Sequence, residues 1–143
     1  MPVKPIPDGY HAVTPYLIVA DAQKLIDFLT AAFGAELRGQ MMRPDGKIWH
    51  TEMKIGDSVI MLAESMPNFP ALVSMLYIYV EDVDATFAKA IAAGATSIRP
   101  PEDQFYGDRS GGVTEPCGNT IWIGTHIEDV PDDEIRRRAA AKG

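Results

Sequence analysis

Two stretches of the chain repeat the same order of apolar and polar positions, about 60 residues apart. Residues 16–21 and 77–82, YLIVAD and YIYVED, each resemble a short strand that ends in an acidic residue. Apolar residues at helical spacing follow each strand, and a glycine, Gly34 or Gly94, ends the helical pattern. The pattern therefore predicts a strand followed by an amphipathic helix in each half of the chain.

Three further strands are predicted after each helix. Turn-forming residues separate them, namely Pro44-Asp45-Gly46, Gly56-Asp57, Pro100-Pro101 and Pro116-Cys117-Gly118-Asn119. The predicted strands span residues 35–42, 47–55 and 58–63 in the first half and 96–99, 111–115 and 120–125 in the second. Each half is thus a β-α-β-β-β unit, and because one such unit of about 60 residues buries little core, we expect the two to pack together.

This order of elements predicts an α+β protein with one domain overall, built from two βαβββ modules. The predicted parts are an extended N-terminal arm (1–11), a first module (12–63), a linker (64–72), a second module (73–128) and a C-terminal tail with a short helix (129–143). The arm contains Pro2, Pro5 and Pro7, which favour extended backbone. In the tail, acidic residues precede basic ones, an order that the helix dipole favours.

Composition narrows the possible partners. The 143 residues include 13 Lys and Arg and 20 Asp and Glu. The resulting net charge of −7 disfavours binding to nucleic acid or to anionic membranes. The chain has no apolar run as long as a membrane span and no signal-peptide core at its N-terminus. A single cysteine, Cys117, excludes an internal disulfide framework and a cysteine-rich zinc module. We therefore expect a cytoplasmic protein.

Short motifs along the chain are similar to those of one family. They are VTPYLIVAD at 13–21, AFGAE at 32–36, PDGKIWH at 44–50, GDSVIML at 56–62, VEDVD at 80–84, EDQFYGDR at 102–109, EPCGN at 115–119 and TH at 125–126. Over roughly residues 12–130 their combination resembles the vicinal oxygen chelate superfamily, in particular its PhnB-like branch of glyoxalase/bleomycin-resistance-type proteins.

This resemblance implies a glyoxalase/bleomycin resistance/dioxygenase fold. In that fold each half curls its strands into a concave sheet, with the helix on the convex side. Paired halves form a partly closed mixed β-barrel, and the cleft between them binds the ligand. The halves pair within one chain in some members and across two chains in others, and the sequence leaves both arrangements open.

The resemblance also implies where a metal would bind. Metal-dependent members use His, Gln or Glu at four positions, on the first and last strands of each half. The repeat and its Asp and Gly landmarks place these positions at Thr14, Met75, Trp122 and either Ile60 or Met61. None of these side chains suits zinc, nickel, manganese or iron. The sequence therefore predicts no metal and no cofactor, which weakens any transfer of glyoxalase or dioxygenase chemistry.

Aromatic and sulfur-containing side chains take the place of metal ligands. Strand alternation puts Thr14 and Tyr16 on one face of the first strand, and Met75, Tyr77 and Tyr79 on one face of its counterpart. A cleft floored by such residues suits a planar or amphipathic organic molecule. The alternative, that these side chains simply fill the barrel, has equal weight.

Two polar segments are further candidates. His50 and Glu52 lie two residues apart on one face of strand 47–55, opposite Trp49, where they can share a hydrogen bond or bind a displaced metal. A solvated polar stripe is the more common outcome for such a strand. In the segment 105–109, FYGDR, the Arg can orient a ligand carboxylate or phosphonate, or else pair across the sheet. His11, His126 and Cys117 are interpreted as surface or structural residues.

Three functions follow from these observations. The favoured one is a metal-free protein that binds a small molecule for sequestration or transport, acts as a homodimer and has no turnover. The alternatives are a lyase, isomerase or dioxygenase-type enzyme with a displaced metal on His50 and Glu52, and an assembly or regulatory protein with a filled barrel. The candidate cleft residues are Thr14, Tyr16, Trp49, His50, Glu52, Met75, Tyr77, Phe105, Tyr106, Arg109 and Trp122.

Overall fold

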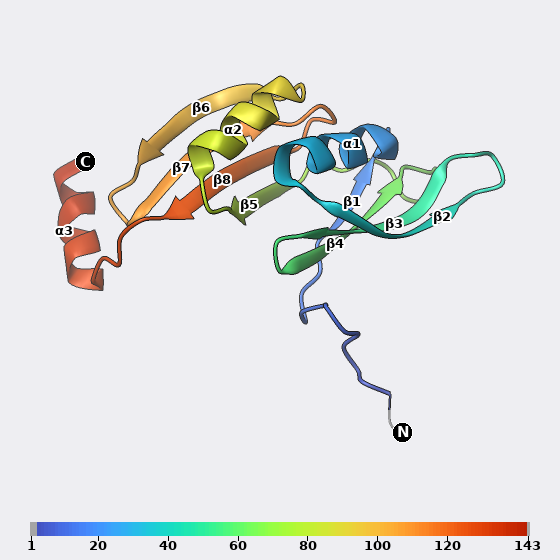
Figure 1. The fold of residues 1–143 in the computed structure, drawn as a ribbon, viewed down its shortest axis with the longest axis horizontal. Helices are drawn as coiled ribbons and strands as arrows, with labels where there is room; N and C mark the ends of the chain where they lie inside the picture. Colours follow the sequence, from blue (N-terminus) through green and yellow to red (C-terminus); the bar gives the residue numbers. More distant parts are fainter. Residues whose placement is uncertain (1–2, 143) are drawn as a thin grey trace.

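The computed structural model describes residues 3–142, so Met1 and Pro2 of the predicted arm and Gly143 of the tail lie outside the described residues. The chain folds as two βαβββ modules followed by one helix (Figure 1). The first module contains β1 (Tyr16–Val19), α1 (Ala22–Phe33), β2 (Glu36–Met42), β3 (Ile48–Ile55) and β4 (Ser58–Glu64). The second contains β5 (Met75–Tyr79), α2 (Val83–Ala92), β6 (Thr96–Asp103), β7 (Asp108–Thr114) and β8 (Thr120–His126), and α3 spans Asp132–Lys142. The predicted fold class is confirmed.

Each module forms its own four-stranded mixed sheet. The strand orders are β1-β4-β3-β2 and β5-β8-β7-β6, and in each sheet the first strand pairs parallel with the last. The two sheets lie side by side, with α1 and α2 packed against each other on the same side (Figure 1). Cys117 also links the modules, because its thiol donates a hydrogen bond to the Asp21 carbonyl at 3.4 Å. The result is an open arch rather than a closed barrel, and we call the side opposite the helices the open face.

The core lies between the helices and the sheets. Alternate strand residues such as Leu17, Met53, Leu62 and Ile123 are almost fully buried on the helix-facing side. Their burial with the apolar face of α1 contributes about 1.5–3 kcal/mol for each large side chain. One contiguous cluster of buried residues extends over both modules. This explains why neither module needs a large core of its own.

The helix boundaries follow local chemistry. The Asp21 carboxylate accepts a hydrogen bond from the Lys24 N–H at 3.1 Å, and Asp82 caps α2 in the same way. Gly34 ends α1 with a φ of 64°, a left-handed conformation that glycine adopts without strain. Of the two caps considered for the second helix, Asp82 and Asp84, the structure shows Asp82.

Two strand boundaries in the second module differ from the prediction. β6 does not end at residue 99 but continues through Pro100 and Pro101. It is the outermost strand of its sheet, so prolines cost it fewer hydrogen bonds, and the pairing register shifts between Arg99 and Glu102. β7 begins at Asp108, three residues before its predicted start, so Asp108 and Arg109 belong to a strand and not to a loop.

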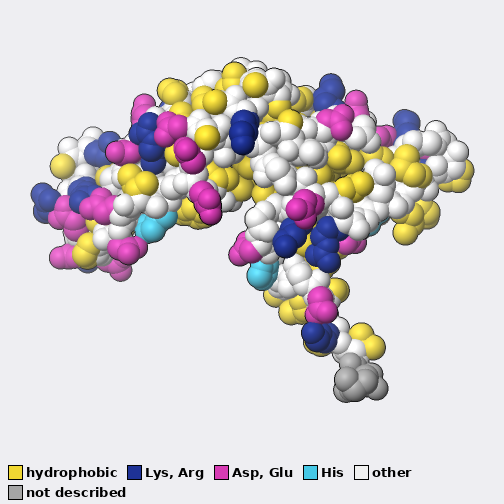
Figure 2. Space-filling view, viewed as in Figure 1, with side chains coloured by type: hydrophobic (Ala, Val, Ile, Leu, Met, Phe, Trp, Pro, Cys, Tyr) yellow, Lys and Arg dark blue, Asp and Glu magenta, His cyan; other side chains and the backbone are white. Residues whose placement is uncertain are grey.

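The predicted C-terminal helix is present as α3 and buries none of its residues. Arg138 connects it to the rest of the molecule through an ion pair with Glu128 and a hydrogen bond to the Phe105 carbonyl, and it also pairs with Glu134 within the helix. Acidic and basic side chains intermix over this end of the molecule (Figure 2). No helix in residues 3–142 is both long enough and apolar enough to cross a membrane.

Candidate ligand-binding site

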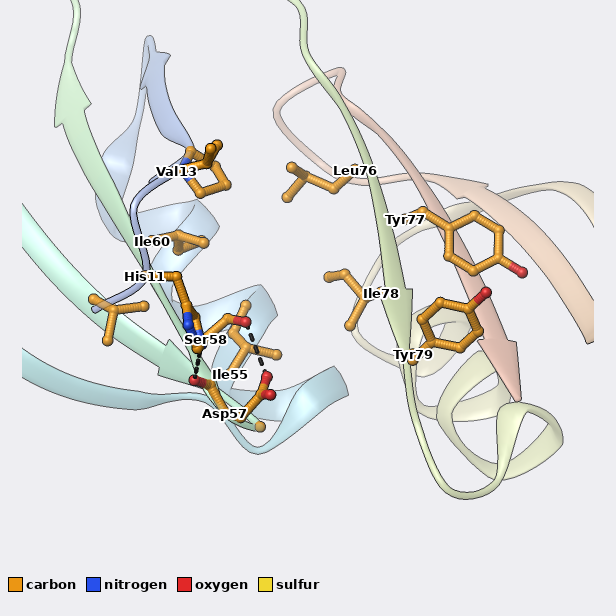
Figure 3. Close-up of a pocket in the computed structure, with 13 residues that line it drawn as sticks. His11, Val13, Ile55, Asp57, Ser58, Ile60, Leu76, Tyr77, Ile78 and Tyr79 are labelled. Carbon is orange, nitrogen blue, oxygen red and sulfur yellow. Dashed lines mark hydrogen bonds between the residues drawn. The ribbon is translucent and has the colours of Figure 1, made fainter. Parts of the chain in front are cut away.

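The side chains of β5 alternate between two environments. All four residues 76–79 line a cavity of about 540 Å³ between the modules, but the side chains of Leu76 and Ile78 point into it, whereas the rings of Tyr77 and Tyr79 lie on the other side of the strand (Figure 3). The alternation of this strand therefore puts both tyrosines on one face, as the sequence predicted, and in the structure this is the open face of the second module. Met75 lies on the same face and is 66% exposed.

Two glycines allow aromatic rings to lie flat on this open face. A Cβ atom at Gly112 would be 2.5 Å from the Trp122 ring, which occupies the space above that glycine on the neighbouring strand. A Cβ atom at Gly124 would likewise collide with the Tyr77 ring and hydroxyl. Any larger residue at either position would lift the ring away from the backbone. We call the Tyr77 and Trp122 rings the aromatic platform.

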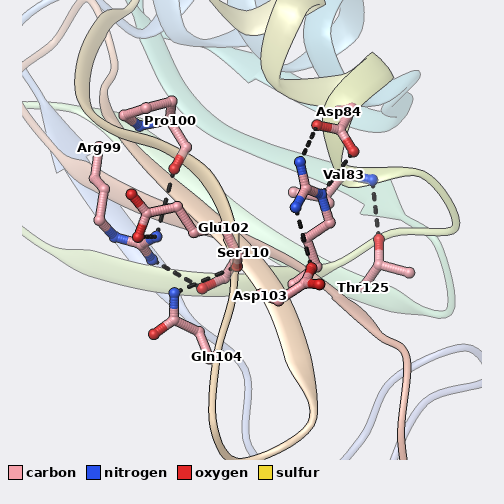
Figure 4. A network of polar contacts seen from close by, with 10 residues as sticks. Val83, Asp84, Arg99, Pro100, Glu102, Asp103, Gln104, Ser110 and Thr125 are labelled. Carbon is pink, nitrogen blue, oxygen red and sulfur yellow. Dashed lines mark hydrogen bonds and ion pairs between the residues drawn. The ribbon is translucent and has the colours of Figure 1, made fainter. Parts of the chain in front are cut away.

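A cation lies over the Trp122 ring of the aromatic platform. The Arg99 guanidinium carbon is 5.3 Å from the centroid of the Trp122 ring, a cation–π distance. Its Nη2 donates to the Ser110 hydroxyl at 3.0 Å, and its Nη1 is 3.3 Å from the Glu102 carboxylate (Figure 4). The platform therefore has a positive group over one end, in a chain whose net charge is negative.

At the other end of the platform, Asp108 is the centre of a polar network. The hydroxyls of Tyr77 and Tyr79 both donate to Oδ2 of Asp108 at 2.8 Å, and Nδ1 of His126 is 2.9 Å from its Oδ1. Nε2 of His126 is 2.7 Å from the carboxylate of Asp129. Asp108 is only 4% exposed, so its carboxylate is nearly shielded from water and depends on these hydrogen bonds.

This network shifts the protonation of its members. Burial is the largest influence on Asp108 and raises its pKa, but the hydrogen bonds from His126, Tyr77 and Tyr79 together outweigh burial and leave the pKa below its usual value. Hydrogen bonds to Asp108 and Asp129 raise the pKa of His126. Burial, together with the Asp108 carboxylate, raises the pKa of Tyr77. The network therefore favours a charged carboxylate and a charged imidazole.

The first module has a second His–carboxylate pair on its open face. Nε2 of His50 is 3.1 Å from the Glu52 carboxylate, the contact that the sequence suggested, and Nδ1 is 2.9 Å from the Tyr16 hydroxyl. Burial and the nearby Glu52 raise the pKa of Tyr10 to about 12. The neighbouring Tyr10 hydroxyl and His50 lower the pKa of Glu52. This pair is therefore a partly buried polar cluster rather than a fully solvated stripe.

Other predicted residues lie away from the aromatic platform. Tyr16 and Trp49 line a separate cavity of about 400 Å³ in the first module. Thr14 precedes β1 and is partly buried. The Phe105 and Tyr106 rings pack edge to face, with centroids 5.3 Å apart, in the turn before β7.

Arg109 lies on the α2 side of its sheet. Its guanidinium pairs with Asp84 at 2.9 and 3.0 Å and with Asp103 at 3.0 Å (Figure 4). Of the two roles that the sequence left open for Arg109, the structure shows the ion pair. All three of these groups lie opposite the open face, so Arg109 is not adjacent to the aromatic platform.

The four positions where the resemblance places metal ligands do not suit a hard divalent cation. The register selects Met61 rather than Ile60 as the counterpart of Trp122. Met61 and Met75 offer only thioethers, Thr14 offers only a hydroxyl, and the Trp122 indole lies above Gly112. Within residues 3–142, no three or more His, Cys, Asp or Glu side chains are grouped so that they could hold a metal ion. The pair formed by His50 and Glu52 therefore has no third ligand of these types among the described residues.

Three groups around the platform, Arg99, Asp108 and His126, were absent from the sequence-derived candidates, and Tyr79 was placed on the same face as Tyr77 without entering the final list. Tyr79 shares strand parity with Tyr77, so alternation alone was sufficient to find it. Asp108 and His126 are 18 residues apart, and only the register between β7 and β8 makes them direct partners. Arg99 on β6 meets Trp122 on β8 across the one intervening strand, β7, and no short-range signal in the sequence indicates that contact.

Comparison with known proteins agrees with this fold. The family model for the Glyoxalase/Bleomycin resistance protein/Dioxygenase superfamily matches residues 10–123. An uncharacterized protein of Mycobacterium bovis is 36% identical over 143 aligned residues, which cover 92% of this chain and 94% of that protein. An uncharacterized protein of Arabidopsis thaliana is 28% identical, over 82% of this chain and 81% of its own length.

Solved structures show the same architecture. The crystal structure of TioX from Micromonospora sp. ML1 has a TM-score of 0.70 and 24% identity, over 82% of this chain and 99% of that one. At this level of identity the likeness concerns the fold alone. The PhnB-like branch stays a prediction, but the match of the family model over most of the sequence is sufficient at the coarser level: the chain belongs to the Glyoxalase/Bleomycin resistance protein/Dioxygenase superfamily.

Proposed function

We propose that the protein binds a planar aromatic small molecule without a metal, and sequesters or carries it on the open face of the second module. The observation that supports this proposal is the aromatic platform, in which Trp122 lies over Gly112 and Tyr77 over Gly124. Flat rings on a sheet provide a stacking surface, and a stacked aromatic partner contributes about 0.5–1.5 kcal/mol beyond the area that it buries.

The exposure of the platform favours binding over simple filling of the barrel. A side chain that only fills a barrel is covered by its neighbours, but of the two platform residues Tyr77 is 42% exposed and Trp122 is only partly buried. Arg99 also places a positive charge next to these rings, which is not expected of side chains that only fill an apolar interior. The same surface therefore offers stacking area, a cation and hydrogen-bonding groups, which is the mixture typical of small-molecule sites.

A fluorescent probe tests this proposal directly. The chain has two tryptophans, so Trp49→Phe leaves Trp122 as the only indole. We expect 8-anilinonaphthalene-1-sulfonate, an anion with a planar naphthalene ring, to quench Trp122 in this variant and to increase in its own fluorescence. Adding Trp122→Leu should weaken probe binding by up to about tenfold, because it removes the stacking surface. Equal probe affinity with and without Trp122 would contradict the proposal.

We also propose that the protein is a homodimer whose second copy covers part of the open faces. Several large apolar side chains there or beside them are about half exposed or more, including Met41, Met42, Phe69 and Met75. Large exposed apolar side chains of this kind are common at protein–protein contacts. A second copy would convert two open arches into enclosed clefts.

Light scattering coupled to size-exclusion chromatography measures the assembly. We expect twice the chain mass at micromolar concentration. The variant Met75→Lys should shift the mass toward one chain, because it places a charge in the proposed contact. Lys47→Glu, a charge change in the exposed turn between β2 and β3, serves as the control and should leave the mass unchanged. A single-chain mass for the unmodified protein would refute the dimer.

A further inference from the structure

The buried carboxylate of Asp108 holds the His126 imidazole in one orientation. Asp108 receives two tyrosine hydroxyls on Oδ2, which leaves Oδ1 for Nδ1 of His126. Because Asp108 is buried, its carboxylate cannot turn toward solvent. The imidazole is therefore fixed with Nδ1 toward Asp108 and Nε2 toward the outside.

The carboxylate that contacts Nε2 of His126 belongs to Asp129 and, unlike that of Asp108, is exposed. Asp129 meets Nε2 at 2.7 Å, but its side chain is fully exposed and it lies in the segment between β8 and α3. An exposed carboxylate can rotate into water with little loss, because water replaces the hydrogen bond. The contact with Asp129 therefore shows that an oxyanion fits beside Nε2 of His126. Because the Asp129 side chain is exposed, another oxyanion can replace it.

This imidazole is close to the proposed binding surface. The Tyr77 ring forms part of the aromatic platform, and its hydroxyl bonds to the same carboxylate that holds His126. His126 is about half exposed and lines a cavity of about 740 Å³ together with Tyr79. The platform thus has Arg99 over its Trp122 ring and, beyond the Tyr77 hydroxyl, the Asp108 carboxylate that holds His126.

We propose that the ligand of the aromatic platform carries a weakly acidic hydroxyl, of the phenol or enol type, and binds as its oxyanion against Nε2 of His126 in place of Asp129. This inference rests on the proposed function and specifies its ligand class. On binding, the ligand O–H bond breaks and its electron pair stays on oxygen. The proton goes to Nε2 of a neutral His126, or to water where His126 is already protonated.

The charges around His126 are compatible with this exchange. The ionised groups that contact the imidazole are Asp108 and Asp129, whereas Glu81 lines the same cavity but forms no ion pair with it. Tyr77 and Tyr79 donate hydrogen bonds from their hydroxyls to Asp108 and so remain neutral. The ligand oxyanion replaces one carboxylate at Nε2 while Asp129 moves into water. The number of negative charges that contact the imidazole therefore stays the same, so no uncompensated charge is buried.

The probe for this inference is 4-nitrophenol, whose phenolate absorbs visible light and whose phenol does not. We expect the protein to raise the phenolate-to-phenol ratio by about tenfold or more relative to buffer of the same mildly acidic pH. His126→Gln should bind the probe without this enrichment, and Asp129→Ala should bind the phenolate more tightly because the competing carboxylate is gone. His11→Gln, which alters a histidine bonded to the Asp57 carbonyl, should behave like the unmodified protein.

The outcomes separate this inference from the proposed function. The sulfonate probe described above has no proton to give, so it reports on the platform alone. Sulfonate binding without enrichment of nitrophenolate would overturn the inference and leave the proposed function intact. Equal enrichment in the unmodified protein and in His126→Gln would also overturn it, because the phenolate would then be stabilised elsewhere. Loss of both signals in the unmodified protein would refute both proposals.

Discussion

Replacing Gly112 with Ala is expected to displace Trp122 from the sheet and to destabilise the fold by about 1–3 kcal/mol. The added methyl group would be 2.5 Å from the indole ring, and the ring cannot move away without leaving its place on the backbone. The affinity for the sulfonate probe should fall by up to about tenfold, because the stacking surface is disturbed. Urea unfolding followed by circular dichroism measures the stability, and probe fluorescence measures the binding.

Two further variants isolate the cause. Gly39→Ala places a methyl group in open space on β2 and measures the intrinsic effect of Ala in a strand, which is slightly stabilising. In a Trp122→Leu background, Gly112→Ala should cost little, because the clashing ring is gone. A coupling free energy of about 0.5–3 kcal/mol between the two positions is the expected result. Purely additive effects would show that the collision with Trp122 is not the cause.

Replacing Leu62 with Ala is expected to reduce the free energy of unfolding by about 2–5 kcal/mol. Leu62 is fully buried at the centre of β4, between β1 and β3, and its removal leaves a cavity facing the core. Ile98→Ala is the control, because Ile98 on the edge strand β6 is 48% exposed and should cost about 1 kcal/mol or less. Chemical denaturation measures both.

The position of the two tryptophans extends this experiment. Trp49 reports on the first module and Trp122 on the second, so Trp122→Phe and Trp49→Phe each leave a single reporter. Because one buried cluster spans both modules, Leu62→Ala should lower the unfolding midpoint by the same amount at both reporters. A shift confined to Trp49 would mean that the modules unfold independently.

Local signals were sufficient to predict most of the fold. The repeated strand motif, Asp21 as a helix cap and Gly34 as a helix stop act over a few residues, and each appears in the structure as expected. The errors occurred where tertiary position overrides local preference. Pro100 and Pro101 normally end a strand, but the edge position of β6 tolerates them.

The site was less predictable, because it depends on pairing between strands. Trp122 and Tyr77 were found from alternation and from the resemblance to a family. Gly112 and Gly124 allow the two rings to lie close to the sheet backbone. These glycines have this effect only because of the residues that lie opposite them in the sheet. The bond between Asp108 and His126 depends on the same register. The register depends on all strands of the sheet, so no short segment of the sequence predicts it.

The duplicated fold has a consequence for how such a surface can evolve. The row Tyr77–Trp122–Gly112 in one sheet corresponds to Tyr16–Met61–Glu52 in the other, with the same strand pairing. Each half thus displays different chemistry on an equivalent backbone. Because alternate residues of every strand face away from the core, substitutions on the outer side leave the core packing intact. One copy can therefore acquire new ligand chemistry while the other preserves its own, and selection can act on the two surfaces separately.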